Sequence, residues 1–161
     1  MIVVSDTSPL NYLIVIDAID LLPQLFADIH APTRVIQELQ RSRAPLSVRQ
    51  WAHSPPAWLH VSVPTTKIAT SVRLDPGEIE AIALAKELRA QTILIDVRKG
   101  RRVARELGLR AVGTVAVLEL AAERKLLDLK STLESLRQTT FYISDEYISA
   151  ALARDAARQR R

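Results

Sequence analysis

The sequence has no cysteine among its 161 residues and only 3 histidines. The absence of cysteine excludes disulfide bonds, thiolate catalysis and cysteine-ligated zinc or iron–sulfur centres, and it is compatible with a reducing cytosol. The histidines, His30, His53 and His60, are scattered without the spacing of metal ligands, so we assign them no role. Any metal ion is therefore expected to bind oxygen ligands.

Glycine, proline and long apolar runs are also scarce. The chain has 4 Gly, 8 Pro and 48% hydrophobic residues, a composition typical of globular proteins and not of disordered or fibrous ones. No linker rich in Gly, Ser or Pro divides the sequence, so we expect one domain over residues 1–161. No apolar stretch reaches the roughly 20 residues of a membrane span, and the N-terminus has no secretory signal. We expect a cytoplasmic protein without a membrane partner.

The charge balance favours a polyanionic partner only slightly. The net charge is +4 and the isoelectric point is near 9.8, values that fit a nucleic-acid-binding protein. An excess of this size is also common in proteins that never contact nucleic acid.

Two short apolar runs rich in β-branched residues each end in an aspartate. MIVVSD at 1–6 and TILID at 92–96 predict strands buried on both faces, each followed by a helix. Ser8 is expected to cap the first of these helices, with Pro9 as its first residue. Further strands are expected at 29–31, 59–63 and 110–113, and helices at 10–16, 18–26, 32–41, 45–53, 78–88, 99–107 and 114–125, with two more near the C-terminus. Strands separated by helices predict an α/β fold with a mainly parallel sheet.

Asp6 and Asp96 close the two buried strands. In a parallel sheet the carboxyl ends of the strands lie at one edge, where ligands bind. A single aspartate there is more often a turn or cap residue, but two acids at one edge repel each other unless a cation or protons intervene. Oxygen-only ligation suits Mg²⁺ or Mn²⁺, and such a metal favours phosphodiester hydrolysis.

The helix after LDPG carries two glutamates, Glu78 and Glu80, which point in very different directions because they are two residues apart. Glu78 falls within the apolar arc that includes Ala81 and Ile82, whereas Glu80 lies on the opposite side. Glu78 is the better ligand candidate, although a glutamate in a first helical turn also stabilises the helix N-terminus without any other role. The choice between the two stays open at this point.

Three further polar residues depend on this context. Glu38 flanks the apolar face of its helix, a position at which a lone glutamate is usually solvated. Thr7 and Ser8 follow the first acid closely enough to orient a water molecule or a phosphate, and a helix-capping role accounts for them equally well.

A basic helix follows Asp96. The segment DVRKGRRVAREL places Arg98 and Arg102 along one helical stripe with Lys99 beside it, where they could hold a phosphate backbone. The alternative is a solvated helix face on which Arg102 pairs with Glu106 at i,i+4.

Taken together, these segments resemble the PIN-domain superfamily, and within it the branch related to VapC-type toxins of prokaryotic toxin–antitoxin pairs. The resemblance runs nearly end to end and is carried by VVSDTSPLNYL, VIQEL, LDPGEIEAIALAKEL, TILIDVRKGRRVARELGL, GTVAVL and ISDEYI. It implies a three-layer α/β/α sandwich and a metal-dependent endoribonuclease that acts on single-stranded RNA.

The resemblance also assigns the ligands. Asp6, Glu38, Glu78 and Asp96 match the family's acids, which converge on Mg²⁺ or Mn²⁺. Many family members have Asp where Glu78 stands, so a longer side chain must reach the same site. The resemblance further implies the toxin component of a type II toxin–antitoxin pair, a homodimer, and a cognate antitoxin protein whose C-terminal segment inserts near the active site.

Two other functions compete with this reading. A phosphatase of the haloacid-dehalogenase type needs a second aspartate two positions after its nucleophile, and here that position is Ser8. A noncatalytic PIN-like RNA-binding or scaffold module would keep the fold without turnover. The intact set of acids argues against this noncatalytic module. A cleavage assay separates the module from the nuclease.

Overall fold

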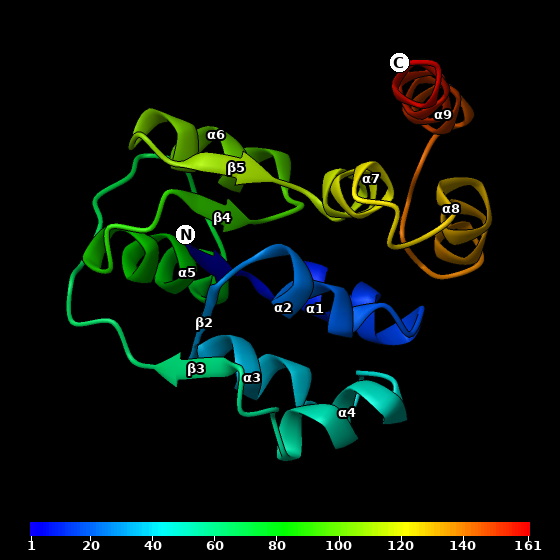
Figure 1. Ribbon diagram of the computed structural model, residues 1–161. Coiled ribbons are helices and arrows are strands. Elements are labelled where there is room, and N and C mark those ends of the chain that lie inside the picture. The colour runs from blue at the N-terminus through cyan, green and yellow to red at the C-terminus, as the bar shows by residue number, and fades with distance from the viewer. The chain divides into compact units, whose positions relative to one another are not determined.

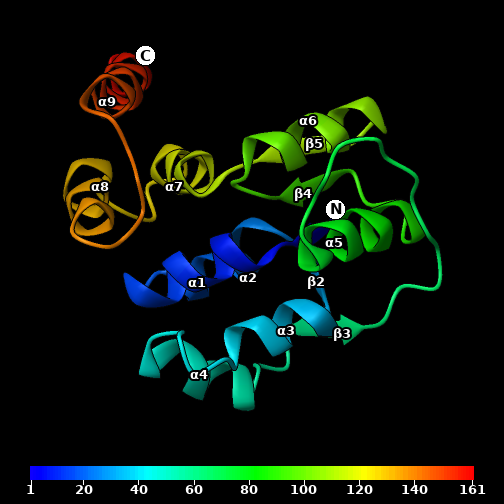
Figure 2. The ribbon, with the colours of Figure 1, turned by 180° about the vertical axis from the view of Figure 1, so that it is seen from behind.

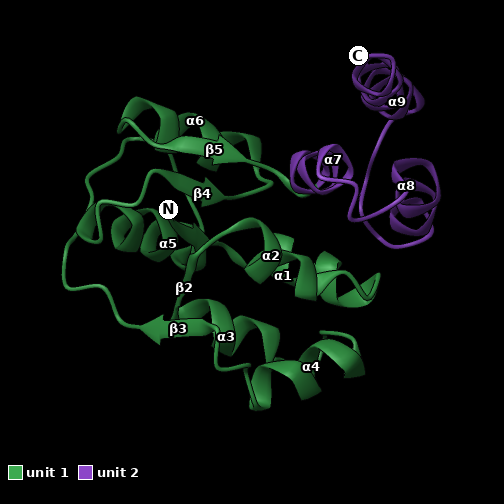
Figure 3. Ribbon diagram, in the orientation of Figure 1, with its two compact units in different colours: residues 1–114 green, residues 115–161 purple.

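The computed structural model describes residues 1–161, which divide into two compact units, Met1–Thr114 and Val115–Arg161 (Figure 3). The first unit contains the whole sheet and both aspartates predicted at its edge. The second unit is helical. The expectation of one domain over the full length stays a prediction.

The sheet has five strands, and every neighbouring pair is parallel. They are β1 Ile2–Ser5, β2 Asp28–Pro32, β3 Leu59–Ser62, β4 Thr92–Leu94 and β5 Arg110–Val112, in the order β3-β2-β1-β4-β5 (Figure 1). Helices flank this sheet, so the predicted three-layer α/β/α sandwich with a mainly parallel sheet is confirmed.

The helices of the first unit lie within or close to the predicted ranges. They are α1 Thr7–Val15, a short 3-10 helix Ile19–Leu21, α2 Leu22–Leu25, α3 Thr33–Leu39, α4 Leu46–His53, α5 Pro76–Glu87 and α6 Arg98–Glu106. Three more follow: α7 Thr114–Glu123, which begins at the boundary between the units, α8 Leu129–Arg137 and α9 Asp145–Gln159.

The start of α1 differs from the prediction. The helix begins at Thr7, with Asp6 as its N-cap residue, so Ser8 is not the cap and Pro9 is the third helical residue instead of the first. Proline is compatible with this position because the first four backbone N–H groups of a helix have no partner within the helix. The Ser8 hydroxyl is thereby free to act outside the helix.

The start of α5 is also earlier than predicted. The helix begins at Pro76, and Asp75 and Glu78 form a capping box at its N-terminus. The spacing Asp-x-x-Glu is a known helix-start signal, and proline is favoured at the first helical position. The segment LDPG is therefore partly the first turn of the helix and not wholly a loop.

The core of the first unit forms between the central strands and α5. α5 packs on β1, β2 and β4 and lies between α3 and α6 (Figure 2). Val4 of β1, Ile93 of β4 and Ile82 of α5 are fully buried in one cluster. Burying an apolar side chain of this size contributes about 1.5–3 kcal/mol, so this cluster stabilises the packing of α5 on the strands that carry the acids.

The second unit has its own apolar contacts. Leu118, Leu129, Leu133 and Leu136 are buried, and Arg154 of α9 donates two hydrogen bonds to the Glu119 carboxylate of α7, at 2.8 and 3.0 Å. None of the helices in the chain is both long and apolar enough to cross a membrane.

The strand order places a crevice next to both predicted aspartates. From β1 the chain proceeds to β2 and β3, then crosses back to β4 and β5 on the other side of β1. Ligands of open α/β sheets bind at the carboxyl ends of the strands where the order reverses in this way. Asp6 directly follows β1, and its backbone N–H donates to the Leu94 carbonyl at the end of β4, at 2.8 Å.

Candidate functional site

A pocket of about 310 Å³ lies at this carboxyl edge of the sheet. We call it the acid pocket because four of its lining residues carry carboxylates. Its lining consists of Asp6, Thr7, Ser8, Asn11, Tyr12, Glu38, Asp75, Glu78 and Val97. Three of the four predicted acids, together with Thr7 and Ser8, thus surround one cavity.

Asp6 is the most deeply buried of the acids, with 4% of its surface exposed. Burial raises the pKa of Asp6 to about 7; the backbone N–H of Thr7 opposes this shift, and the charges of Glu78, Glu38 and Asp96 add to it. A carboxylate in this environment favours a proton or a cation over an uncompensated negative charge.

Glu38 reaches the acid pocket from α3. Its Oε2 accepts a hydrogen bond from the Thr7 hydroxyl at the start of α1. A Cβ atom on Gly77 would lie 2.5 Å from Oε1 of Glu38, closer than real Cβ contacts occur. The carboxylate of Glu38 therefore has room only because residue 77 has no side chain.

Glu78 combines the two roles that the sequence left as alternatives. Its Oε2 accepts the backbone N–H of Asp75 at 3.3 Å, which caps α5, and the same side chain lines the acid pocket. Burial raises the pKa of Glu78, the backbone N–H of Asp75 lowers it, the carboxylates of Asp75 and Glu38 raise it further, and Lys99 lowers it.

Glu80 lies outside the acid pocket. Its Oε2 accepts a hydrogen bond from Nε of Arg34 at 2.9 Å, in a partly exposed ion pair. Of the two glutamates at the start of α5, Glu78 is the one beside Asp6.

Asp96 does not line the acid pocket but is held next to it. Its Oδ2 accepts from the Ser8 hydroxyl at 2.7 Å, and the Thr114 backbone N–H and hydroxyl donate to Oδ1 and Oδ2, each at 2.7 Å. Three hydrogen bonds fix the direction of this carboxylate, and Ser8 links it to the pocket wall.

Sequence reasoning missed four polar residues of this arrangement. Asp75, Asn11 and Tyr12 line the acid pocket, and Thr114 holds Asp96. The Asp-x-x-Glu spacing of the capping box was a signal for Asp75. Asn11 and Tyr12 lie three to five residues after Thr7 and Ser8 on α1, the spacing of one helix face, which is a weaker signal.

A second pocket adjoins the acid pocket and shares three residues with it, Asp75, Glu78 and Val97. We call it the basic pocket. Its volume is about 340 Å³, and its remaining lining residues are Arg73, Arg98 and Lys99. Arg98 and Lys99 thus lie beside the acids.

Arg102 lies outside both pockets. Its Nε donates to Glu106 at 3.2 Å, and both side chains are mostly exposed. The i,i+4 pair that was the alternative to RNA contact is therefore formed in the structure.

The chemistry of the acid pocket fits a hard divalent cation, since every charged group that lines it is a carboxylate and the pKa of Asp6 is raised. No group of three or more Asp, Glu or His side chains has an arrangement that could hold a metal ion as it stands. Glu38, Glu78 and Asp96 each accept hydrogen bonds from within the chain. A bound cation would compete with those donors.

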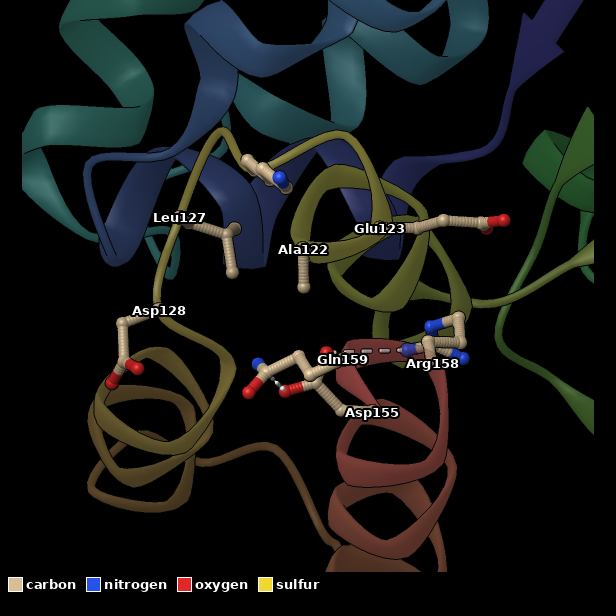
Figure 4. Close-up of a pocket in the computed structure, with 8 residues that line it drawn as sticks. Ala122, Glu123, Leu127, Asp128, Asp155, Arg158 and Gln159 are labelled. Carbon is tan, nitrogen blue, oxygen red and sulfur yellow. Dashed lines mark hydrogen bonds and ion pairs between the residues drawn. The ribbon is translucent and has the colours of Figure 1, made fainter. Parts of the chain in front are cut away.

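A further pocket of about 390 Å³ lies in the second unit (Figure 4). It is lined by Ala122, Glu123, Lys125, Leu127, Asp128, Asp155, Arg158 and Gln159. Asp155 accepts from Gln159 at 3.0 Å and pairs with Arg158 at 3.5 Å, and Nε of Arg158 is buried without a partner. This pocket contains none of the predicted site residues, and its charges are mixed, so the acid pocket is the candidate active site.

Comparison with known proteins gives two matches. A family model described as a PIN domain matches residues 2–156, a range that includes all four predicted acids. Among solved structures, the chain is similar to a PilT N-terminus domain protein from the hyperthermophilic archaeon Sulfolobus solfataricus, with 16% sequence identity and a TM-score of 0.48 over 89% of this chain and 100% of that one. No curated protein matches the chain.

Proposed function

This chain belongs to the PIN-domain family, and on that premise we propose that it is a metal-dependent endoribonuclease that hydrolyses phosphodiester bonds of single-stranded RNA. Membership of this family supports a nuclease-type function. The observation that carries the proposal is the acid pocket, in which Asp6, Glu38 and Glu78 line one cavity at the reversal point of the sheet. The raised pKa of Asp6 supports the proposal, because burial disfavours the bare carboxylate and a bound cation would offset its charge.

In the proposed reaction, Asp6, Glu38 and Glu78 would hold Mg²⁺ or Mn²⁺, with Asp96 beside them. When bound, such a cation lowers the pKa of a water molecule and offsets negative charge on the scissile phosphate. The chain's own residues orient the reactants: Ser8 lines the acid pocket, and its hydroxyl donates a hydrogen bond to Asp96 at 2.7 Å, which fixes the side chain.

Thr7 has a related role in this proposal. Its hydroxyl donates to Oε2 of Glu38, and this hydrogen bond orients that carboxylate in the acid pocket. The nearby positive charges of Arg98 and Lys99 attract the RNA backbone, because a phosphate chain gains affinity from each cation that it contacts.

The biological setting follows from the resemblance alone. We propose that the protein is the toxin component of a type II toxin–antitoxin pair, that it forms a homodimer, and that a cognate antitoxin protein blocks the acid pocket. These proposals rest on the branch of the family that the sequence resembles.

One observation favours the noncatalytic RNA-binding alternative: the acids are occupied by hydrogen bonds within the chain, and no three of them are arranged to hold a metal. The two functions differ in turnover. Purified protein, free of any antitoxin, is incubated with single-stranded RNA in Mg²⁺ or Mn²⁺, with and without EDTA. The proposal expects cleavage that stops in EDTA and in Asp6→Asn. RNA binding without cleavage under all these conditions would establish the noncatalytic module instead.

A further inference from the structure

The basic pocket contains positive charges that have no partner in the chain. Five arginines elsewhere, Arg34, Arg102, Arg137, Arg154 and Arg158, each pair with a carboxylate. Arg73, Arg98 and Lys99 are exposed and form no salt bridge. The charge of Lys99 lowers the pKa of Glu78 by a longer-range Coulomb interaction, without an ion pair. These three cations outnumber the two carboxylates that line the same pocket, Asp75 and Glu78, and give it an excess of positive charge.

The backbone adds to this positive charge. α6 begins at Arg98, and the side chain of its N-cap residue Val97 makes no capping hydrogen bond to the first amides of the helix. The N-terminus of a helix carries a partial positive charge and free N–H donors, which favour anions. The cations of Arg98 and Lys99 lie in the same first turn.

Arg73 comes from a different part of the chain, the segment that leads into α5. Since Asp75, Glu78 and Val97 line both pockets, the basic pocket opens directly beside the acid pocket. Asp75 and Glu78 are the acidic groups in the basic pocket, and Glu78 is one of the proposed cation ligands. A cation at the acids would remove part of the repulsion that an anion meets in the basic pocket.

We propose that the basic pocket binds a non-scissile phosphate of the RNA strand, next to the phosphate that is cleaved in the acid pocket, with Arg73, Arg98 and Lys99 as its ligands. This inference rests on the proposed nuclease function and names the residues that place the strand. Arg73 and the two residues of α6 then act as positioning residues: they hold the strand so that the neighbouring phosphate lies at the acids.

The test uses the full chain and a short fluorescein-labelled single-stranded RNA with one cleavage site mapped on the wild-type protein. The variants are Arg73→Ala and Lys99→Ala. Arg110→Ala is the matched control, because Arg110 is an exposed arginine at the start of β5, at the other end of the strands from the acids. Affinity is measured on the cleavage-deficient Asp6→Asn background at several salt concentrations, and KM and kcat on the active background.

The expected result is that Arg73→Ala and Lys99→Ala each weaken RNA binding about tenfold, as the loss of a charged hydrogen bond predicts. The slope of log affinity against log salt should fall by about 0.7 for each lost contact to a single-stranded phosphate. KM should rise more than kcat falls, and Arg110→Ala should behave like wild type. Equal RNA affinity, salt dependence and KM in all three variants would overturn the inference, whereas the proposed nuclease function would be unaffected.

A second arm locates the phosphate. In matched RNAs, single phosphates flanking the cleavage site are replaced by uncharged methylphosphonate. Replacement of one particular flanking phosphate should weaken RNA binding by the wild-type protein as much as Arg73→Ala does. The same replacement should not weaken RNA binding by the Arg73→Ala protein any further. Strictly additive losses at every position would show that Arg73 contacts no particular phosphate. If the wild-type protein cleaves no RNA with any metal ion, the proposed nuclease function itself fails. That outcome is distinct from equal RNA binding by the three variants and from additive losses in the methylphosphonate series.

Discussion

The carboxylate of Glu38 occupies the space that a side chain at Gly77 would need. Oε1 and Oε2 of Glu38 would lie 2.5 and 2.7 Å from a Cβ atom on Gly77. Gly77 has no unusual φ angle, so the glycine is required by this close approach and not by the backbone. The Glu38 carboxylate can thus keep this position beside the N-terminus of α5 only while residue 77 has no side chain.

Gly77→Ala is expected to displace the Glu38 carboxylate and to lower RNA cleavage at least about tenfold. Alanine is a better helix former than glycine, by about 1 kcal/mol in a helix interior and by less at the second position of α5, so the variant should still fold. The thermodynamic test is a double-mutant cycle of melting temperatures: Gly77→Ala should raise stability more on a Glu38→Ala background than in the wild-type protein. Identical effects on the two backgrounds would contradict the close approach.

Glu78→Gln and Glu80→Gln should have unequal effects. Glu78 lines the acid pocket, so removing its charge should reduce kcat severely, whereas Glu80→Gln removes a partly exposed pair with Arg34 and should cost less than about 1 kcal/mol of stability. Cleavage rates and melting curves of both variants check this. An inactive Glu80→Gln protein beside an active Glu78→Gln protein would reverse the assignment.

The hydrogen bonds to Asp96 should matter for turnover more than for RNA affinity. Thr114→Val keeps the shape of a fully buried side chain and removes one hydroxyl donor to Asp96; we expect a lower kcat, an almost unchanged KM and a stability loss of about 1–2 kcal/mol. Thr114→Ser should restore kcat. Thr92→Val is the control, since Thr92 is a buried threonine at the start of β4 that donates no bond to the acids. The same fall in kcat for both valine variants would argue against a specific role for Thr114.

The metal-free protein should lose stability as the pH rises. The pKa of Asp6 is raised from 3.8 to about 7 by burial, so the folded state binds the proton more tightly than the unfolded state. The resulting stabilisation is complete below about pH 4 and is lost as the pH rises through about 7. Asp6→Asn removes the charge at every pH, and in EDTA at pH 8 this variant should exceed the wild type in stability by at most about 4 kcal/mol. Denaturant unfolding between pH 4 and 8 measures the difference, and parallel pH profiles for the two proteins would refute it.

Mn²⁺ should raise the melting temperature of the wild-type protein, because a ligand that binds only the folded state stabilises it. Asp6→Asn should respond less, and Glu80→Gln should respond like wild type, since Glu80 lies outside the acid pocket. A melting curve unchanged by millimolar Mn²⁺ would show that the acids do not bind the metal.

Local sequence signals were sufficient for much of the fold. The β-branched runs before Asp6 and Asp96 predicted two buried strands, and the alternation of strands with helices predicted the parallel sheet; both are present. Because parallel strands end at one edge, the sequence by itself also placed Asp6 and Asp96 on the same side of the molecule.

The tertiary structure decided how the acids are used. Glu78 faces Asp6 and Glu80 pairs with Arg34, because packing of α5 on β1, β2 and β4 sets the rotation of the helix. The carboxylate of Asp96 accepts hydrogen bonds from Ser8 and from Thr114, which lies in a different segment of the chain, and these bonds fix its direction. Arg73 joins Arg98 and Lys99 only through folding. The periodicity of a single segment predicts the secondary structure of that segment. The direction of a charged side chain depends instead on hydrogen-bond donors and on space that other segments, distant in the sequence, supply. Only the packed chain brings these segments together.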